Sequence, residues 1–109
     1  MSFAAGRPCP SESVHTIADG MACRVPDPRA LEIILAGVAR VVTVDDNAIQ
    51  AAMLNLFTDT HNVAEGAGAA ALAALCQERS RMRGRRVAII QTGGNVDRET
   101  FAGILAQTS

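Results

Sequence analysis

Arg86 to Asp97 read Arg-Val-Ala-Ile-Ile-Gln-Thr-Gly-Gly-Asn-Val-Asp, and no other segment of the chain says more about its architecture. Val87 to Ile90 are consecutive apolar residues with β-branched ends, which is typical of a strand buried on both faces of a parallel sheet. Asp97 can cap a following helix with an apolar stripe. Residues 91–95 then form either an ordinary turn or a loop that is free to take positive φ and to bring backbone N–H groups close to a ligand. Ligands in open α/β sheets bind beyond the carboxyl ends of the strands, so chemistry is expected at this loop.

The preceding sequence repeats the alternation of strand and helix. Residues 40–44 (Arg-Val-Val-Thr-Val) predict a second strand. Three helices are predicted from capping residues or composition: residues 28–37 after Asp27, residues 46–60 after Asp45, and the alanine-rich residues 67–79. The expected buried face of the first helix is Leu31, Ile34 and Leu35. The predicted fold class is therefore α/β, a partial parallel sheet flanked by helices.

The N-terminal part of the chain is less regular. Residues 1–13 carry no periodicity and predict a flexible tail, which leaves residues 14–109 as the domain. Val14 to Cys23 is a short β-like run that contains the turn dipeptide Asp19-Gly20. Gly20 either serves a plain turn or lets the backbone come close to a ligand.

Composition excludes several classes of protein. A length of 109 residues fits one domain, and a net charge of −1 with a pI of about 6.1 argues against nucleic-acid binding. There is no apolar run of the ~18 residues that a membrane span needs and no signal peptide, so a cytoplasmic protein is expected. Three cysteines without CxxC spacing predict free thiols. All ten basic residues are arginine, so the chain offers no lysine amine for a Schiff base.

Three local patterns have plainer explanations than a binding site. Gly66, Gly68 and Ala71 satisfy the dinucleotide pattern G-x-G-x-x-A, but no full strand precedes them and no acidic residue ends the next predicted strand. The five arginines of residues 79–86 fall at a helix end and predict a solvated surface. The histidines and nearby acids are too scattered to form a metal site.

Three motifs now stand in a recognisable order: residues 16–20 (Thr-Ile-Ala-Asp-Gly), residues 65–69 (Glu-Gly-Ala-Gly-Ala) and residues 92–97 (Thr-Gly-Gly-Asn-Val-Asp). Together they resemble the C-terminal part of the serine/threonine ammonia-lyases, the threonine dehydratase family of fold-type II pyridoxal phosphate enzymes. The likeness runs from about Val14 to Leu105; each motif alone is weak, whereas the three together are specific. The resemblance implies that the chain is a segment of the family's large, cofactor-binding catalytic domain.

The resemblance also implies roles for matching residues. Thr92 stands where the family usually has a serine whose hydroxyl hydrogen-bonds the pyridine nitrogen of the cofactor, and a hydroxyl can donate or accept. This neutral partner makes the ring a milder electron sink than an aspartate would, which suits β-elimination of water. Gly20 matches a glycine that lines the cofactor ring, and Glu65 matches a glutamate close to the cofactor. The rest of the last motif shapes the loop that presents Thr92: Gly93, Gly94 and Asn95.

The chain departs from the family pattern in two residues and in its extent. Thr92 replaces the usual serine, and Gly66 replaces the proline of a Glu-Pro-x-Gly segment. The family's Schiff-base lysine, substrate-carboxylate loop, phosphate-binding loop and acidic metal site have no counterpart, which agrees with the lack of lysine. The chain is therefore interpreted as a fragment that holds one wall of the cofactor pocket. It is expected to have no catalytic residue and no metal ligand of its own, and to be inactive alone.

Two functional hypotheses follow. In the first, the parent protein is a dehydratase that converts threonine or serine to a 2-oxo acid and ammonia. The choice of substrate, of elimination or racemisation, and of L or D configuration is then expected to rest with residues outside the chain. The apolar face of a partial domain predicts a homo-oligomer. In the second, the chain is a free-standing, non-catalytic α/β module that binds a partner through the same face.

Overall fold

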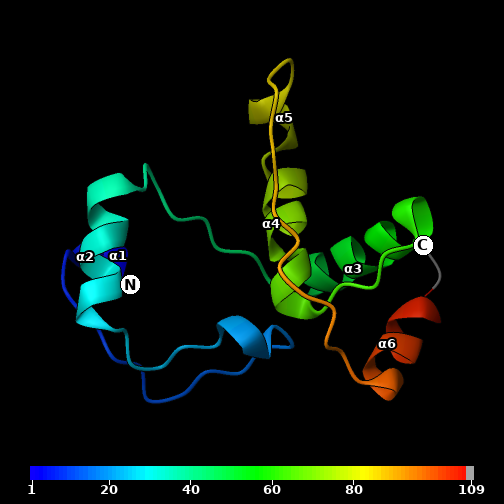
Figure 1. The fold of residues 1–109 in the computed structure, drawn as a ribbon, viewed down its shortest axis with the longest axis horizontal. Helices are drawn as coiled ribbons and strands as arrows, with labels where there is room; N and C mark the ends of the chain where they lie inside the picture. Colours follow the sequence, from blue (N-terminus) through cyan, green and yellow to red (C-terminus); the bar gives the residue numbers. More distant parts are fainter. Residues whose placement is uncertain (108–109) are drawn as a thin grey trace.

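The computed structural model describes residues 1–107, and this part of the chain is helical (Figure 1). The elements follow in the order α1 (Ser2–Ala5), the 3₁₀ helix η1 (Asp19–Met21), α2 (Pro28–Gly37), α3 (Asp46–Thr60), α4 (Gly66–Gln77), α5 (Arg79–Met82) and α6 (Arg98–Leu105). None of the helices within residues 1–107 combines the length and apolar character needed to cross a membrane.

Three of the predicted helix starts are confirmed. At each start an aspartate accepts a hydrogen bond from a backbone N–H of the first turn, which satisfies a donor that has no partner within the helix. The pairs are Asp27 with Ala30 (2.9 Å), Asp45 with Ala48 (2.7 Å) and Asp97 with Thr100 (2.8 Å). The alanine-rich helix begins at Gly66 and ends at Gln77, close to its predicted bounds.

The core lies where α3, α4 and α6 meet. Ile49 and Met53 of α3 are each 1 % exposed and are the largest fully buried side chains among the described residues. The buried cluster is completed by Ile104 of α6 and by five alanines, Ala18, Ala52, Ala64, Ala69 and Ala73. Phe57 packs edge-to-face on Phe101, with ring centroids 5.6 Å apart. Because most buried side chains are alanines, the core depends on close approach of the helices rather than on bulky residues.

The helices α1 and α2 form a separate pair at one side of the molecule (Figure 1). Residues 1–13, for which the sequence predicts a flexible tail, contain α1. Of the expected buried face of α2, only Leu31 is buried; the prediction is wrong for Ile34 and Leu35, which are 39 % and 40 % exposed. The reason is that α2 packs on the short α1 and not on a sheet.

The predicted partial parallel sheet is wrong for this chain, because no strand forms within residues 1–107. Residues 40–44 and 87–90 are extended but make no backbone-to-backbone hydrogen bond with another described segment, and residues 14–23 turn through η1 instead of forming a strand. A strand requires a second backbone to accept and donate its hydrogen bonds. The sequence pattern marks the extended segments correctly, but it cannot supply their partners.

Candidate functional site

The first motif, residues 16–20, is held on the start of α3 by Asp46. The Asp46 carboxylate accepts a hydrogen bond from the Thr16 hydroxyl through Oδ1 and from the Ile17 N–H through Oδ2 (3.2 Å). Thr16 Oγ1 in turn accepts from the Ala18 N–H (3.1 Å). Asp46 therefore fixes the path of the chain into η1 and Gly20.

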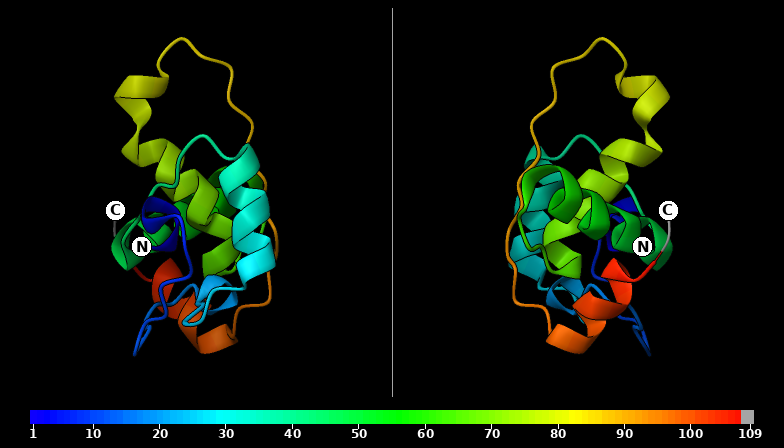
Figure 2. Two further views of the ribbon diagram at one scale, coloured as in Figure 1. Left: turned by 90° about the vertical axis from the view of Figure 1, so that its left-hand side faces the viewer. Right: turned by 90° about the vertical axis from the view of Figure 1, so that its right-hand side faces the viewer.

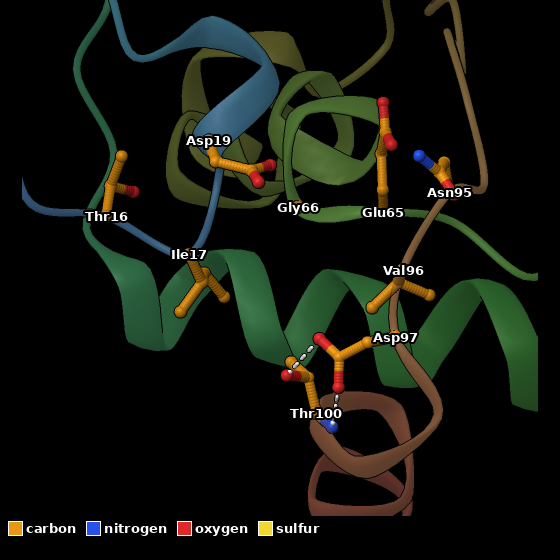
Figure 3. A pocket seen from close by; sticks show the side chains of 9 residues that line it. All are labelled: Thr16, Ile17, Asp19, Glu65, Gly66, Asn95, Val96, Asp97 and Thr100. Atoms are coloured by element: carbon orange, nitrogen blue, oxygen red, sulfur yellow. Dashed lines mark hydrogen bonds between the residues drawn. The ribbon is translucent and has the colours of Figure 1, made fainter.

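The second motif lies directly against the first. A Cβ at Gly66 would lie 2.8 Å from the Ile17 carbonyl oxygen and 2.9 Å from Ala18 Cα. Both contacts are with backbone, so only glycine permits this approach. Figure 3 shows the chain of residues 17–19 crossing beside Gly66 at the N-terminus of α4.

Glu65 connects the three motifs. Its backbone N–H donates to the Gly93 carbonyl (3.0 Å). Its carboxylate Oε1 lies 3.6 Å from the ideal Cβ position of Gly20 and 2.7 Å from that of Gly93. The carboxylate is thus placed between two glycines that are 73 positions apart in the sequence. The structure thus brings Gly20, Glu65 and Gly93 together, and their contact with a cofactor stays a prediction.

The loop of residues 91–95 is fastened to the extended segment before α4. Gln91 Nε2 donates to the Val63 carbonyl (3.2 Å), and a Cβ at Gly94 would lie 2.6 Å from the same oxygen. The loop is free to take positive φ but does not do so: within residues 1–107, the glycines with positive φ are Gly6 and Gly84. Glycine is needed at position 94 because the Val63 backbone approaches closely.

A cavity of about 230 Å³ opens beside these motifs. Figure 3 shows the side chains of Glu65 and Asn95 directed to the same side of the chain at this cavity, with Asp97 and Thr100 below them. Of the predicted site residues, Glu65 and Asn95 line the cavity. Gly20, Thr92, Gly93 and Gly94 do not line this cavity, and Thr92 is exposed.

Thr92 has an accessible hydroxyl. Its side chain makes no hydrogen bond within residues 1–107, and the residue is exposed at the tip of the extended segment. A free hydroxyl can still donate one hydrogen bond and accept two. The loop that carries it is held on both sides, by Gln91 and by Gly93, so the position of Thr92 is set by the scaffold.

Asp97 carries the main electrostatic feature of this region. The Thr100 hydroxyl donates to Asp97 Oδ2 (2.6 Å), and this bond together with the Thr100 N–H lowers the pKa of the Asp97 carboxyl below its usual value. Asp97 is therefore ionised at neutral pH and is committed to capping α6. The same carboxylate lines the cavity.

Sequence reasoning misses the roles of Thr16 and Asp46. The sequence marks Asp46 only as a favourable residue in the first turn of its helix, whereas its carboxylate holds residues 16–18. The signal is the pair Asp45-Asp46, since one helix start needs one cap and the second acid is free for another partner. The five arginines of residues 79–86 are exposed, as the sequence predicts.

Comparison with known proteins identifies the family. The family model described as "Pyridoxal-phosphate dependent enzyme" matches residues 1–93. This chain belongs to the pyridoxal-phosphate dependent enzyme family. It is similar to L-threonine ammonia-lyase from Thermotoga maritima, with 36 % identity over 96 residues that make up 88 % of this chain and 24 % of that protein.

Solved structures agree with this membership of the pyridoxal-phosphate dependent enzyme family. The T.th. threonine deaminase superposes with a TM-score of 0.82 at 34 % identity, covering 88 % of this chain and 35 % of that one. Maize serine racemase superposes with a TM-score of 0.79 at 32 % identity, covering 94 % of this chain and 33 % of that one. The chain thus spans about a quarter to a third of the length of these relatives.

The free hydroxyl of Thr92 is the feature of this region whose chemistry suits pyridoxal phosphate. A Cβ at Gly20 would lie 3.2 Å from that of Ala67 and 3.6 Å from Glu65 Oε1, so this position packs against the second motif. Thr92 offers a hydroxyl that suits a ring nitrogen. The chain cannot supply the amine that binds the cofactor, because its sequence contains no lysine.

Proposed function

We propose that this chain forms one wall of the pyridoxal phosphate pocket of a cytoplasmic ammonia-lyase of the threonine dehydratase type. The observation that carries the proposal is the convergence of the three motifs on Glu65, whose backbone bonds Gly93 and whose carboxylate lies between Gly20 and Gly93. The relatives named as threonine ammonia-lyase and threonine deaminase support the reaction class.

Each of the predicted site residues has its own role at the cofactor. Thr92 holds the pyridine nitrogen of the cofactor by a hydrogen bond from or to its hydroxyl, and Gly93, Gly94 and Asn95 present it. Gly20 lets the backbone line the ring, and Glu65 keeps the loop of Gly20 and the loop of Gly93 at a fixed separation. Pyridoxal phosphate, when bound, supplies an electron-withdrawing ring that stabilises negative charge developing on the substrate.

In this proposal, a lysine outside this chain supplies the amine that binds the cofactor. With no lysine in its sequence, the chain alone is expected to release no ammonia from serine or threonine. The substrate is a small hydroxy amino acid, which is converted to a 2-oxo acid and ammonia when the lysine-bearing part of the fold is present.

The test substitutes Thr92 in a protein that contains both parts, the chain joined to or co-expressed with a lysine-bearing part of the family fold. Losing one hydrogen bond at the ring should reduce turnover in Thr92→Ala by roughly threefold to tenfold, and Thr92→Ser should retain activity. Ammonia release gives the rate, and the visible absorbance of bound cofactor gives occupancy. Equal rates for the alanine variant and the parent protein would remove Thr92 from the site.

A further inference from the structure

The five arginines of residues 79–86 form a cationic projection at one end of the molecule. No acidic residue lies within this stretch, although the chain as a whole has a net charge of −1. Figure 2 shows α5 and the chain that follows it extending beyond the other helices. Within residues 1–107 the ion pair that forms joins Arg40 and Glu78, so none of the five arginines is neutralised by a carboxylate in contact with it. Their charge is therefore available to an anion from outside the chain.

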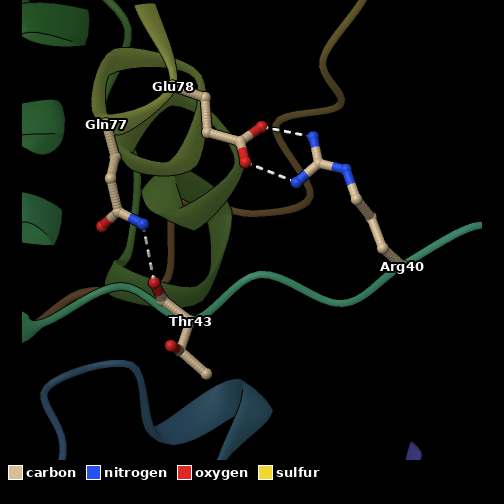
Figure 4. A network of polar contacts seen from close by, with 4 residues as sticks. All are labelled: Arg40, Thr43, Gln77 and Glu78. Carbon is tan, nitrogen blue, oxygen red and sulfur yellow. Dashed lines mark hydrogen bonds and ion pairs between the residues drawn. The ribbon is translucent and has the colours of Figure 1, made fainter. Parts of the chain in front are cut away.

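The acidic residue nearest to these arginines in the sequence, Glu78, is already engaged. Arg40 donates to both of its carboxylate oxygens, as Figure 4 shows. These hydrogen bonds lower the pKa of the Glu78 carboxyl, so it stays ionised and paired with Arg40 at neutral pH. Gln77 Nε2 donates to the Thr43 carbonyl (3.1 Å) and holds the segment that carries Arg40 beside α4. An arginine from outside the stretch thus occupies the carboxylate that lies closest to it in the sequence.

A tight turn fixes the path of the chain through the arginines. The Arg85 N–H donates to the Met82 carbonyl (3.0 Å) and closes a four-residue turn. Arg83 has a φ of −55° and a ψ of 130°, and Gly84 has a φ of 76°, which are the backbone angles of a type II turn. An ideal Cβ at Gly84 has nothing within 4 Å, so the positive φ is the reason for glycine there. Arg83 and Arg85 therefore flank a turn of defined geometry.

A cavity of about 460 Å³ opens where α4, α5 and this turn meet. Its lining includes three apolar residues and three arginines: Leu75, Met82, Val87, Arg79, Arg83 and Arg85. Leu75 and Met82 are partly buried, whereas the three arginines are exposed. The cavity thus combines an apolar floor with a cationic rim, and its volume lies in the range of small-molecule sites.

We propose that this cavity binds a small organic phosphate, with the phosphate group on the arginines and an apolar body against Leu75, Met82 and Val87. A phosphate monoester carries nearly two negative charges and three acceptor oxygens at neutral pH, whereas a carboxylate has one charge and two oxygens. The forked donors of arginine match phosphate oxygens, so three arginines suit the phosphate better. The cavity shares no residue with the cavity at Glu65, so the inference is independent of the proposed function.

The experiment titrates the ¹⁵N-labelled chain with phenyl phosphate and follows the backbone amide signals by NMR. We expect the signals of residues 79–87 to shift. Inorganic phosphate should bind at the same residues about tenfold more weakly, because it cannot cover the apolar floor. Phenol at the same concentrations, which lacks the anionic group, should leave these signals unchanged.

A matched pair of variants locates the charge that binds the phosphate. Arg83→Gln removes one arginine of the rim and should weaken the binding of phenyl phosphate by about fivefold to tenfold. Arg29→Gln removes the same charge from an exposed arginine of α2 that does not line the cavity, and it should leave the affinity unchanged. Both side chains are exposed, and unchanged amide signals in α3 and α6 show that each variant is folded.

Four results would overturn the site. They are the absence of shifts at residues 79–87, equal affinity for phenyl phosphate and inorganic phosphate, equal shifts with phenol, and equal weakening by the two variants. A lipid phosphate is tested with vesicles of phosphatidylcholine that contain phosphatidic acid. A chain that sediments with these vesicles but does not respond to phenyl phosphate would also refute a small-molecule site and make a membrane surface the ligand.

Discussion

Glycine occupies position 68 because the backbone of another loop fills the space beside it. A Cβ there would lie 2.5 Å from the Gly93 carbonyl oxygen, and neither backbone can move independently of its motif. Alanine favours a helix by about 1 kcal/mol over glycine, but the clash is larger, so Gly68→Ala should lower the free energy of unfolding by about 1–3 kcal/mol. Urea unfolding followed by circular dichroism measures the change.

The matched control for this prediction is Gly103→Ala. Gly103 also lies in a helix, α6, and its ideal Cβ has nothing within 4 Å. The same substitution should therefore stabilise the chain by up to about 1 kcal/mol. If the two variants shift stability in the same direction, close contact is not the reason for glycine at position 68.

Single residues of the site divide into those that the sequence can predict and those it cannot. Gly20, Glu65 and Gly93 are singled out by the family resemblance, and the structure brings them together; their contact with a cofactor stays a prediction. The anchoring of residues 16–18 by Asp46 is not predicted, because the contact spans about 30 positions and local patterns do not reveal it. Gly93 and Gly94 do not take positive φ, because glycine here serves close packing, and a sequence does not distinguish these two reasons for glycine.

Among the elements, α3 supplies the largest fully buried side chains of the core, Ile49 and Met53. Met53 is 1 % exposed and lies in the cluster with the alanines of α4, so Met53→Ala leaves a cavity that small neighbours cannot fill. A cost of about 2–5 kcal/mol is expected, enough to unfold much of a small domain. Met21→Ala, at a residue that is 54 % exposed, should change stability by less than about 0.5 kcal/mol. Thermal melts followed by circular dichroism compare the two, and similar melting temperatures would contradict this core.

The cap of α6 predicts a dependence of stability on pH. The hydrogen bonds from Thr100 lower the pKa of Asp97 in the folded chain, so the folded state favours the ionised carboxyl. The stability that this provides is present above about pH 4, the ordinary range of an aspartate, and is lost as the pH falls through the lowered pKa. Asp97→Asn keeps a good capping residue that does not titrate, so its stability should fall less steeply below about pH 4. Urea midpoints from about pH 2 to about pH 6 measure this, and parallel pH curves for the two proteins would refute it.

Whether an interaction is local or between distant segments explains which elements are predictable from the sequence. The caps Asp27, Asp45 and Asp97 act within one turn of their own helix, so the local sequence contains the whole interaction. The strands 40–44 and 87–90 are predicted from equally good patterns, but a strand exists only with a second backbone. The predicted burial of Ile34 and Leu35 is wrong for the same reason, since no sheet forms within residues 1–107 for them to cover.

At the scale of the whole molecule, the chain is less compact than a complete domain. Its radius of gyration is 15.0 Å, whereas a domain of this length is expected near ~13 Å, and its extents of 41 × 37 × 18 Å describe a flat body. Exposed apolar side chains are spread over α2 and both extended segments. The described residues therefore have a small, well-packed centre and a large exposed apolar surface on α2 and both extended segments.

This exposed apolar surface predicts that the chain self-associates when it is alone in solution. Apolar faces with unpaired backbone groups attract one another, and a net charge of −1 gives little repulsion to oppose this. Light scattering over a dilution series should show an average mass that rises above the 11.4 kDa of the monomer as concentration increases. Ile90→Arg, which adds a charge on this surface, should shift association to higher concentration, whereas Val14→Arg adds the same charge elsewhere and should not. A monomer at every concentration would contradict this prediction and would mean that water alone satisfies the backbone groups of the extended segments.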